Sequence, residues 1–165
     1  MTGQKTFTVY EKDVGRGRIA VYGRPSFRMM QHLKESGFDY MVTLLSESEG
    51  AKELGLATKS LGIDWLWYPM PNAKPPEDDQ RLRLAELVML ISSLLDDVEH
   101  IFLHCSAGIH RTGIITYALL RYRGMTAADA KQLLEELRLV TAQGLNDARN
   151  VIAESIVLAA KQLSV

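Results

Sequence analysis

The chain has 165 residues, a formal net charge of −1 and 47% hydrophobic residues, as expected for one globular domain with its own core. This charge gives no basis for binding nucleic acid or an anionic membrane through bulk electrostatics. A single cysteine excludes an internal disulfide framework and favours a reducing compartment. Since the sequence has no apolar leader and no apolar run of 18 residues, we expect one cytoplasmic domain over residues 1–165.

Strands and helices alternate along the chain. Short apolar runs bounded by Gly and Pro predict the strands, and apolar residues at helical spacing predict the helices. Ser26 is a suitable N-cap for the first helix, and Gly37 ends it. Phe27, Met30 and Leu33 share the face of this helix that we expect to be buried. The expected strands are residues 7–10, 18–22, 40–45, 63–68 and 100–103, and the expected helices are 27–36, 47–61, 81–95, 111–123, 126–137 and 146–163.

This alternation predicts an α/β fold in which helices flank both faces of a mostly parallel central sheet. Ligands of such sheets bind at the carboxyl ends of the strands. Residues 69–79 are expected to form a loop, because prolines interrupt regular structure there. Just before this loop, Trp65, Trp67 and Tyr68 are expected in the core or in the wall of a cleft.

Residues 104–113 combine the features of an anion-binding site. An apolar run precedes them and a helical pattern follows, which predicts a strand, a tight loop and the start of a helix. A helix N-terminus offers unpaired N–H groups and the positive end of the helix dipole, and both attract anions. Gly108 lets the loop curl so that successive N–H groups point inward.

Cys105 and Arg111 add a nucleophile and a cation to this loop. The cysteine lies in the positive field of the helix N-terminus, which favours its thiolate form. Six positions later, the planar guanidinium of Arg111 can bind two oxygens of a phosphoryl group at once. Together these residues provide what nucleophilic attack on phosphorus requires.

The sequence HCSAGIHRTG of residues 104–113 resembles the active-site signature of the cysteine-dependent protein tyrosine phosphatases, and the chain's small size resembles their dual-specificity branch. The resemblance implies the fold of that family and a cysteinyl-phosphate intermediate on Cys105. It also implies that Thr112 hydrogen-bonds the sulfur, with capping of the helix N-terminus as its alternative or additional role, and that a buried His104 orders the loop. No metal or cofactor is expected, because the loop and its arginine supply the positive charge. The implied phosphate-binding residues are Ser106, Ala107, Gly108, Ile109, His110 and Arg111.

The sequence departs from this family at the general acid. The family has an Asp on a mobile loop before the cysteine, whereas the matching residue here is Asn72, which has no proton to transfer. In one interpretation Asp78, Glu77 or Asp79 acts as a surrogate acid, although Asp78 and Asp79 also suit a helix N-terminus. In a second, the enzyme lacks a strong acid and prefers good leaving groups, at a cost of about 10²–10⁴ in rate. In a third, Asn72 leaves a slow enzyme that retains its ligand.

Three further polar residues have open roles. At the rim of the loop, His110 either adds a positive group for polyanionic substrates or is simply solvated. Inositide-directed members of the family often carry a loop lysine, which this loop lacks and for which Lys74 is a partial substitute. Gln143 lies where the family sometimes has a residue that positions the hydrolytic water, and it equally suits a surface loop.

These observations predict a phosphomonoester hydrolase of the protein tyrosine or dual-specificity type. Its partner is then a phosphorylated protein or a small phosphorylated substrate. The alternatives are a phosphatase of RNA 5′ ends, inositol phosphates or other non-protein phosphates, and a phosphate-binding module with little turnover. The net charge argues mildly against a long nucleic-acid footprint and leaves binding of RNA ends open.

Overall fold

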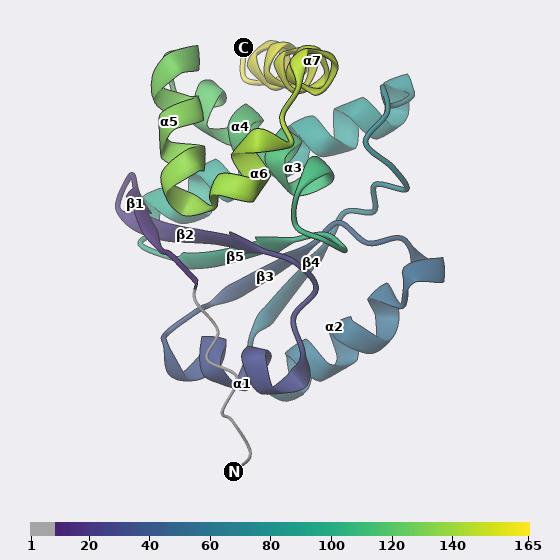
Figure 1. Cartoon of the computed structure of the whole chain (residues 1–165), viewed down its shortest axis with the longest axis vertical. Coiled ribbons are helices and arrows are strands. Elements are labelled where there is room, and N and C mark those ends of the chain that lie inside the picture. Colours follow the sequence, from purple (N-terminus) through teal and green to yellow (C-terminus); the bar gives the residue numbers. More distant parts are fainter. Residues whose placement is uncertain (1–8) are drawn as a thin grey trace.

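Five strands form one sheet in the computed structural model, which describes residues 9–165 (Figure 1). The predicted α/β fold with a mostly parallel sheet is confirmed, because only the pairing of β1 with β2 is antiparallel in the described part of the chain. Strand β5 occupies the middle of the sheet. In order across the sheet, the strands are β1 (Lys12–Val14), β2 (Gly17–Tyr22), β5 (His100–His104), β3 (Tyr40–Thr43) and β4 (Asp64–Trp67).

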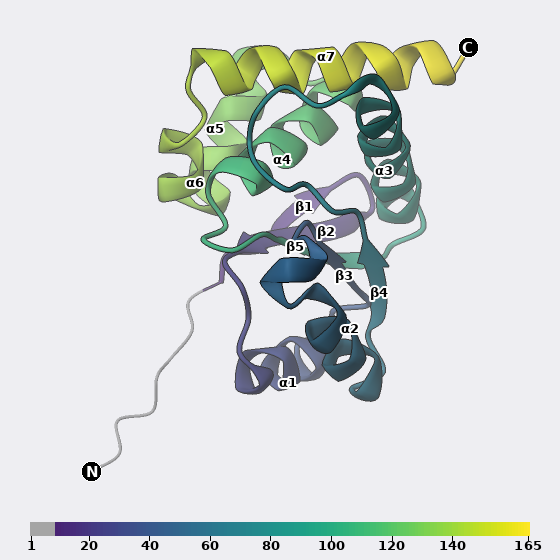
Figure 2. The same cartoon turned by 90° about the vertical axis from the view of Figure 1, so that its right-hand side faces the viewer.

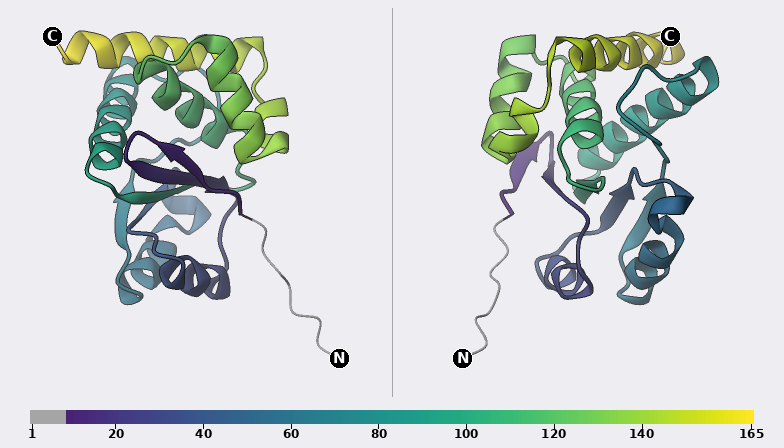
Figure 3. Two further views of the ribbon diagram at one scale, coloured as in Figure 1. Left: turned by 90° about the vertical axis from the view of Figure 1, so that its left-hand side faces the viewer. Right: turned by 45° about the vertical axis from the view of Figure 1, so that its right-hand side comes forward.

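Helices cover both faces of the sheet, as Figure 2 shows. The last helix crosses over two others on the more heavily covered face, which the two views of Figure 3 make clear. No helix among residues 9–165 is long and apolar enough to cross a membrane. One face carries α1 (Phe27–Glu35) and α2 (Ala51–Ser60), and the other carries α3 (Asp78–Asp96), α4 (His110–Tyr122), α5 (Ala127–Leu137), α6 (Leu139–Gln143) and α7 (Asp147–Leu163).

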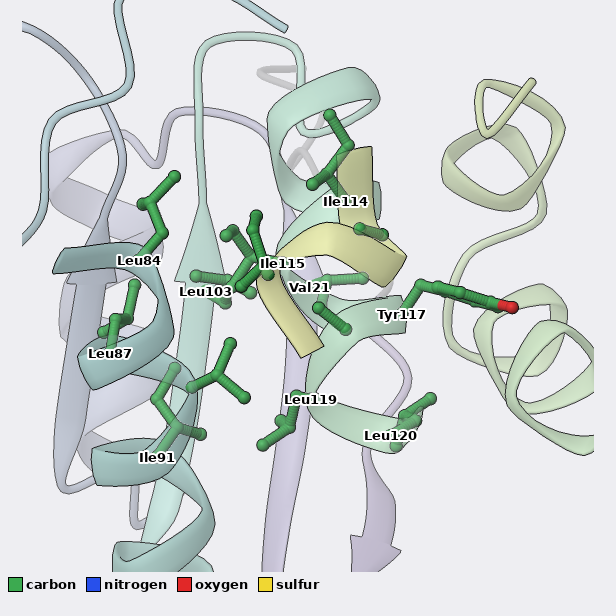
Figure 4. Close-up of a cluster of buried hydrophobic side chains, with 14 of the residues drawn as sticks. Val21, Leu84, Leu87, Ile91, Leu103, Ile114, Ile115, Tyr117, Leu119 and Leu120 are labelled. Carbon is green, nitrogen blue, oxygen red and sulfur yellow. The ribbon is translucent and has the colours of Figure 1, made fainter. Parts of the chain in front are cut away.

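The alternation of side chains along the strands divides the core into two clusters. On β5, Ile101 and Leu103 belong to the cluster under α3 and α4, whereas Phe102 belongs to the cluster over α1 and α2. Figure 4 shows the larger cluster, in which leucines and isoleucines of α3 and α4 pack against Val21 and Leu103. Each such side chain contributes about 1.5–3 kcal/mol on burial. The strand that leads into the site is therefore firmly held on both faces.

Two predicted elements differ near the N-terminus. The predicted strand at 7–10 begins outside the described residues, and its last two residues, Val9 and Tyr10, are not in a strand. In α1, Ser26 caps the helix as predicted, and its side chain accepts a hydrogen bond from Met29 N. Phe27 is 50% exposed, so its predicted burial is wrong, and Met29 joins Met30 and Leu33 in the core instead.

The predicted helix at 47–61 is divided by a glycine. Residues Glu47–Glu49 form a short 3-10 helix, η1, and Gly50 then takes φ +83° before α2 begins. A left-handed residue cannot continue a right-handed helix, and glycine adopts this conformation without steric cost. The short helix α6 was not predicted, and α3 begins at Asp78, three residues earlier than expected.

Candidate active site

The loop of residues 105–109, here called the phosphate loop, connects the end of β5 to α4 at the carboxyl edge of the sheet. Because β5 is the middle strand, the segments that follow β2 and β3 lie beside this loop. Gly108 has φ +69°, and a Cβ atom there would lie 2.2 Å from the carbonyl carbon of Tyr22. Only glycine fits this close approach between the loop and β2.

Every carbonyl group of the phosphate loop accepts a hydrogen bond from a residue that does not line the pocket above it. Since N–H and C=O groups of one peptide point in opposite directions, this pattern leaves the amides of the loop facing the pocket. Among residues 9–165, no backbone N–H of residues 106–111 donates a hydrogen bond, so these groups are available to an anion. The donors are His104 Nδ1 to Cys105 (3.0 Å), Arg24 N to Ser106 (2.8 Å), Arg138 Nη1 to Ala107 and Gly108 (2.9 and 2.8 Å), Thr141 Oγ1 to Gly108 (2.5 Å) and Gly113 N to Ile109 (2.9 Å).

Arg111 is held so that one edge of its guanidinium is left for a ligand. Nη1 donates to Glu49 Oε2 (2.8 Å) and to the carbonyl oxygen of Met70 (2.7 Å), and Nη2 donates to Glu49 Oε1 (2.9 Å). A guanidinium has five N–H bonds, and these contacts use three of them. The other two, on Nε and Nη2, share one edge of the plane and form a fork for two phosphoryl oxygens.

Glu49 is a residue of this site that the sequence reasoning missed. Its hydrogen bonds with Arg111 are the main cause of a pKa lowered to about 2, which the backbone and side chain of Ser46 lower further against the effect of burial. The same contact raises the pKa of Arg111. The sequence feature that could have identified Glu49 is the pattern Ser46-x-x-Glu49 directly after a buried strand. This pattern is typical of a capping box, which at this point places a carboxylate at the carboxyl edge of the sheet.

His104 is fully buried beneath the loop, and its contacts define its tautomer. Nδ1 faces the carbonyl oxygen of Cys105, which can only accept, so Nδ1 carries the proton. Nε2 therefore accepts from Thr43 Oγ1 (2.8 Å), which in turn accepts from Trp65 Nε1 (2.8 Å). Burial lowers the pKa of His104 to about 4, so the ring is neutral at pH 7. This network orders the loop and gives His104 no proton-transfer role.

A pocket of about 250 Å³, here called the catalytic pocket, opens above the phosphate loop. Residues 71–73 line this pocket together with Cys105, His110 and Arg111. Asn72 thus lies in the same pocket as the cysteine, and its Oδ1 accepts a hydrogen bond from Lys74 N (3.0 Å). The sulfur, the amides of the loop and the arginine fork are all present in this one pocket.

The acidic residues that the sequence offered as surrogate acids do not line the catalytic pocket. Asp78 is 90% exposed and pairs with Arg81 at 2.6 Å. Asp79 lines a separate cavity of about 440 Å³ between β4 and α3. Glu77 is the N-cap of α3. Asp78 and Asp79 therefore lie in the first turn of α3, which is the helix N-terminus predicted as their alternative place.

Thr112 lies next to Arg111 in α4 and is fully buried. Its Oγ1 has no hydrogen-bond partner among the described residues, so the hydrogen bond to the sulfur that the resemblance implies is not formed in this structure. Leaving a buried hydroxyl unpaired costs about 1–3 kcal/mol. It does not cap the helix, whose N-cap is Ile109. Lys74 and Gln143 are exposed and do not line the catalytic pocket.

Residues 19–125 match the model of the Tc-R-P family, described as "Polymorphic toxin system, DSP-PTPase phosphatase". No curated protein matches the sequence. Among solved structures, Tk-PTP in its active form has a TM-score of 0.70 at 21% identity, covering 89% of this chain and 95% of that chain. Kinase associated phosphatase with its catalytic cysteine replaced by serine has a TM-score of 0.65 at 16% identity (90% and 98%). TpbA of P. aeruginosa has a TM-score of 0.61 at 14% identity (95% and 92%).

At these identities the solved structures establish a shared fold. The family match is stronger evidence, because it extends from β2 through the phosphate loop and α4 and spans about two thirds of the chain. The chain therefore belongs to the DSP-PTPase phosphatase family and is a cysteine-based phosphatase.

Proposed function

We propose that this phosphatase acts on phosphorylated proteins, with phosphotyrosine and also phosphoserine or phosphothreonine as substrates. One observation carries the proposal: the backbone N–H groups of residues 106–111 donate no hydrogen bond among residues 9–165, and this loop, one edge of Arg111 and Cys105 share one pocket. This donor set matches the oxygens of a phosphoryl group under nucleophilic attack. The single cysteine supports a cytoplasmic location, where a reactive thiolate stays reduced.

In the first step, the thiolate of Cys105 attacks phosphorus on the side opposite the leaving oxygen. The S–P bond forms as the P–O bond to the leaving group breaks, and the leaving oxygen takes up a proton. The loop amides and the Arg111 fork stabilise the negative charge on the equatorial oxygens. Because Glu49 holds the other edge of the guanidinium, Arg111 needs little reorganisation as this charge develops.

In the second step, water attacks the cysteinyl phosphate. The new P–O bond forms, the S–P bond breaks, and the sulfur leaves as a thiolate. Thr112 supports this step, because its buried Oγ1 has no partner among the described residues and is free to donate to the departing sulfur. The products are inorganic phosphate and the enzyme in its starting state.

Asn72 favours a second substrate class, namely phosphoanhydrides such as the 5′-triphosphate end of an RNA. The family's acid position has an amide here, and the nearby carboxylates Asp78 and Asp79 lie outside the catalytic pocket. Leaving groups that are stable as anions need no proton, so a phosphoanhydride loses less from this substitution than a phosphoserine does.

Hydrolysis of p-nitrophenyl phosphate by wild type and Cys105→Ser tests the proposed mechanism. We expect the variant to lose about 10⁴–10⁶ in rate, and equal rates would overturn it. A panel of phosphopeptides and a 5′-triphosphate RNA oligonucleotide then separates the two substrate classes by kcat/KM. Because Cys105 is the only cysteine, alkylation by iodoacetate reports on the nucleophile alone, and inorganic phosphate should protect it.

A further inference from the structure

The catalytic pocket holds one titratable side chain that the reaction described above does not use. Residues 71–73 of its lining are Pro, Asn and Ala, none of which ionises. In the proposed reaction Cys105 is the nucleophile and Arg111 binds phosphate, which leaves His110. His is the side chain whose ordinary pKa is closest to neutral pH.

The carboxylates near the pocket cannot serve instead. Glu49 is committed to Arg111, and its pKa of about 2 keeps it ionised, so it has no proton to give. Asp78 is bound to Arg81, and Asp79 lines the separate cavity beside β4. Among the described residues, elimination therefore leads to His110.

The surroundings of His110 suit proton exchange. It is the first residue of α4, its side chain is exposed at the rim, and its ring forms no hydrogen bond within residues 9–165. The ring lies beside Gly144, where an added methyl group would come within 3.1 Å of Cδ2. The contrast with His104 is direct, because both ring nitrogens of His104 are bonded. Both ring nitrogens of His110 are free for substrate or water.

We propose that His110 transfers the proton in both steps of the phosphatase reaction, an assignment that rests on the proposed function. In the first step, the protonated ring gives its proton to the leaving oxygen as the P–O bond breaks. In the second step, the neutral ring accepts a proton from the attacking water as the S–P bond breaks. The ring thus returns to its starting state after each turnover, and no other reactant is needed.

The charges around His110 determine the pH at which it works. Burial and the positive charge of Arg149 on α7 lower its pKa below the ordinary 6.5. Arg111 from α4 and Cys105 line the same pocket as His110. Residues 139–146 and 71–73 carry no titratable side chain. Because the acid form is populated mainly below pH 6.5, hydrolysis of substrates with basic leaving groups should slow as the pH rises toward that value.

The test compares wild type with His110→Gln on substrates of increasing leaving-group basicity: p-nitrophenyl phosphate, phenyl phosphate and a phosphoserine peptide. Single-turnover reactions with excess enzyme isolate the first step. We expect His110→Gln to lose about 10²–10³ on the phosphoserine peptide and less than about threefold on p-nitrophenyl phosphate. The fall in rate on raising the pH should vanish in the variant. Added imidazole should restore part of the rate of His110→Ala.

His32→Gln is the matched control, because His32 is an exposed histidine on α1 outside the pocket. Thermal melts show whether the variants fold. If His110→Gln loses the same factor on all three substrates, or loses nothing, the role of His110 is overturned while the phosphatase assignment stands. If wild type and Cys105→Ser hydrolyse p-nitrophenyl phosphate equally, the proposed function itself fails.

Discussion

The phosphate loop and residues 71–73 contribute to the same pocket, but they are held in different ways. The phosphate loop receives hydrogen bonds from β5, α4, α6 and the segments after β2 and α5. By contrast, Asn72 accepts a hydrogen bond within its own turn, from the backbone N–H of Lys74. The donors that we propose to stabilise charge on the phosphoryl group are therefore fixed before substrate arrives, whereas residues 71–73 depend on few contacts. This difference predicts that changes to the loop's supports affect all substrates, and that changes at the rim affect only some.

Arg111→Lys should have the largest effect on the fixed side. A lysine keeps the charge but cannot hold Glu49 and Met70 on one edge and two phosphoryl oxygens on the other. We expect kcat to fall about 10²–10³-fold for every substrate. Steady-state kinetics measure this loss. Arg121→Lys, in the last turn of α4, is the control. A loss of activity restricted to one substrate would contradict the prediction that changes to the phosphate loop and its supports affect all substrates.

Asn72→Asp tests the second part of this comparison, namely that a change at the rim of the pocket affects only some substrates. Aspartate can accept the same hydrogen bond from Lys74 N and adds a carboxyl group that can carry a proton. We expect kcat on phosphoserine peptides to rise about 10–100-fold, with little change on p-nitrophenyl phosphate. If His110 is the resident acid, the gain should be larger in the His110→Gln background. No gain in either background would show that the rim does not reach the leaving oxygen.

Glu49→Gln should loosen Arg111 without removing it. The amide keeps one acceptor for Arg111 but loses the charge, so we expect kcat to fall about 10–100-fold for all substrates alike. The variant should also change acid stability. The carboxyl has a lower pKa in the folded protein, so it stabilises the fold above pH 4.5, and that contribution disappears as the pH falls toward 2. Wild type should thus lose about 1–2 kcal/mol more than Glu49→Gln over this range, measured by urea unfolding.

Arg138→Lys should have the smallest effect of the four. The Arg138 side chain donates to two loop carbonyls and lies 4.6 Å from the centre of the Tyr22 ring. Lysine can reach one carbonyl but cannot lie flat on the ring. We expect about a tenfold fall in kcat/KM and a loss of about 1 kcal/mol in unfolding free energy. Thr141 still holds Gly108 in this variant, which limits the damage.

The sequence was most informative where function lies in consecutive residues. The phosphate loop lies within a motif of ten consecutive residues, 104–113, and its strand and helix directly adjoin that motif, so their arrangement could be predicted. Glu49, Arg138 and Thr141 come from distant segments, and only the packing of those segments brings them to the loop. The pattern also could not reveal that Gly50 divides a helix, because glycine is tolerated in helices and the positive φ arises from the turn that places Glu49.

At the position of the general acid, too, the sequence could not predict which side chains come together in space. Asn72 could be identified from its spacing to Cys105, and so could the acidic residues that follow it. Which of those carboxylates reaches the pocket depends on where α3 begins. It begins at Asp78, which keeps Asp78 and Asp79 in the first turn of the helix and out of the catalytic pocket.

The inward-facing amides of the phosphate loop also link folding to anion binding. Orthophosphate, sulfate and vanadate match this ring of donors only when the chain is folded, because the unfolded chain does not assemble it. An oxyanion at a concentration one hundred times its dissociation constant should therefore add about 2.7 kcal/mol to the unfolding free energy. The melting temperature, measured at increasing oxyanion concentration, therefore reports on anion binding by the loop without any turnover. The same measurement can be made on variants that have no catalytic activity.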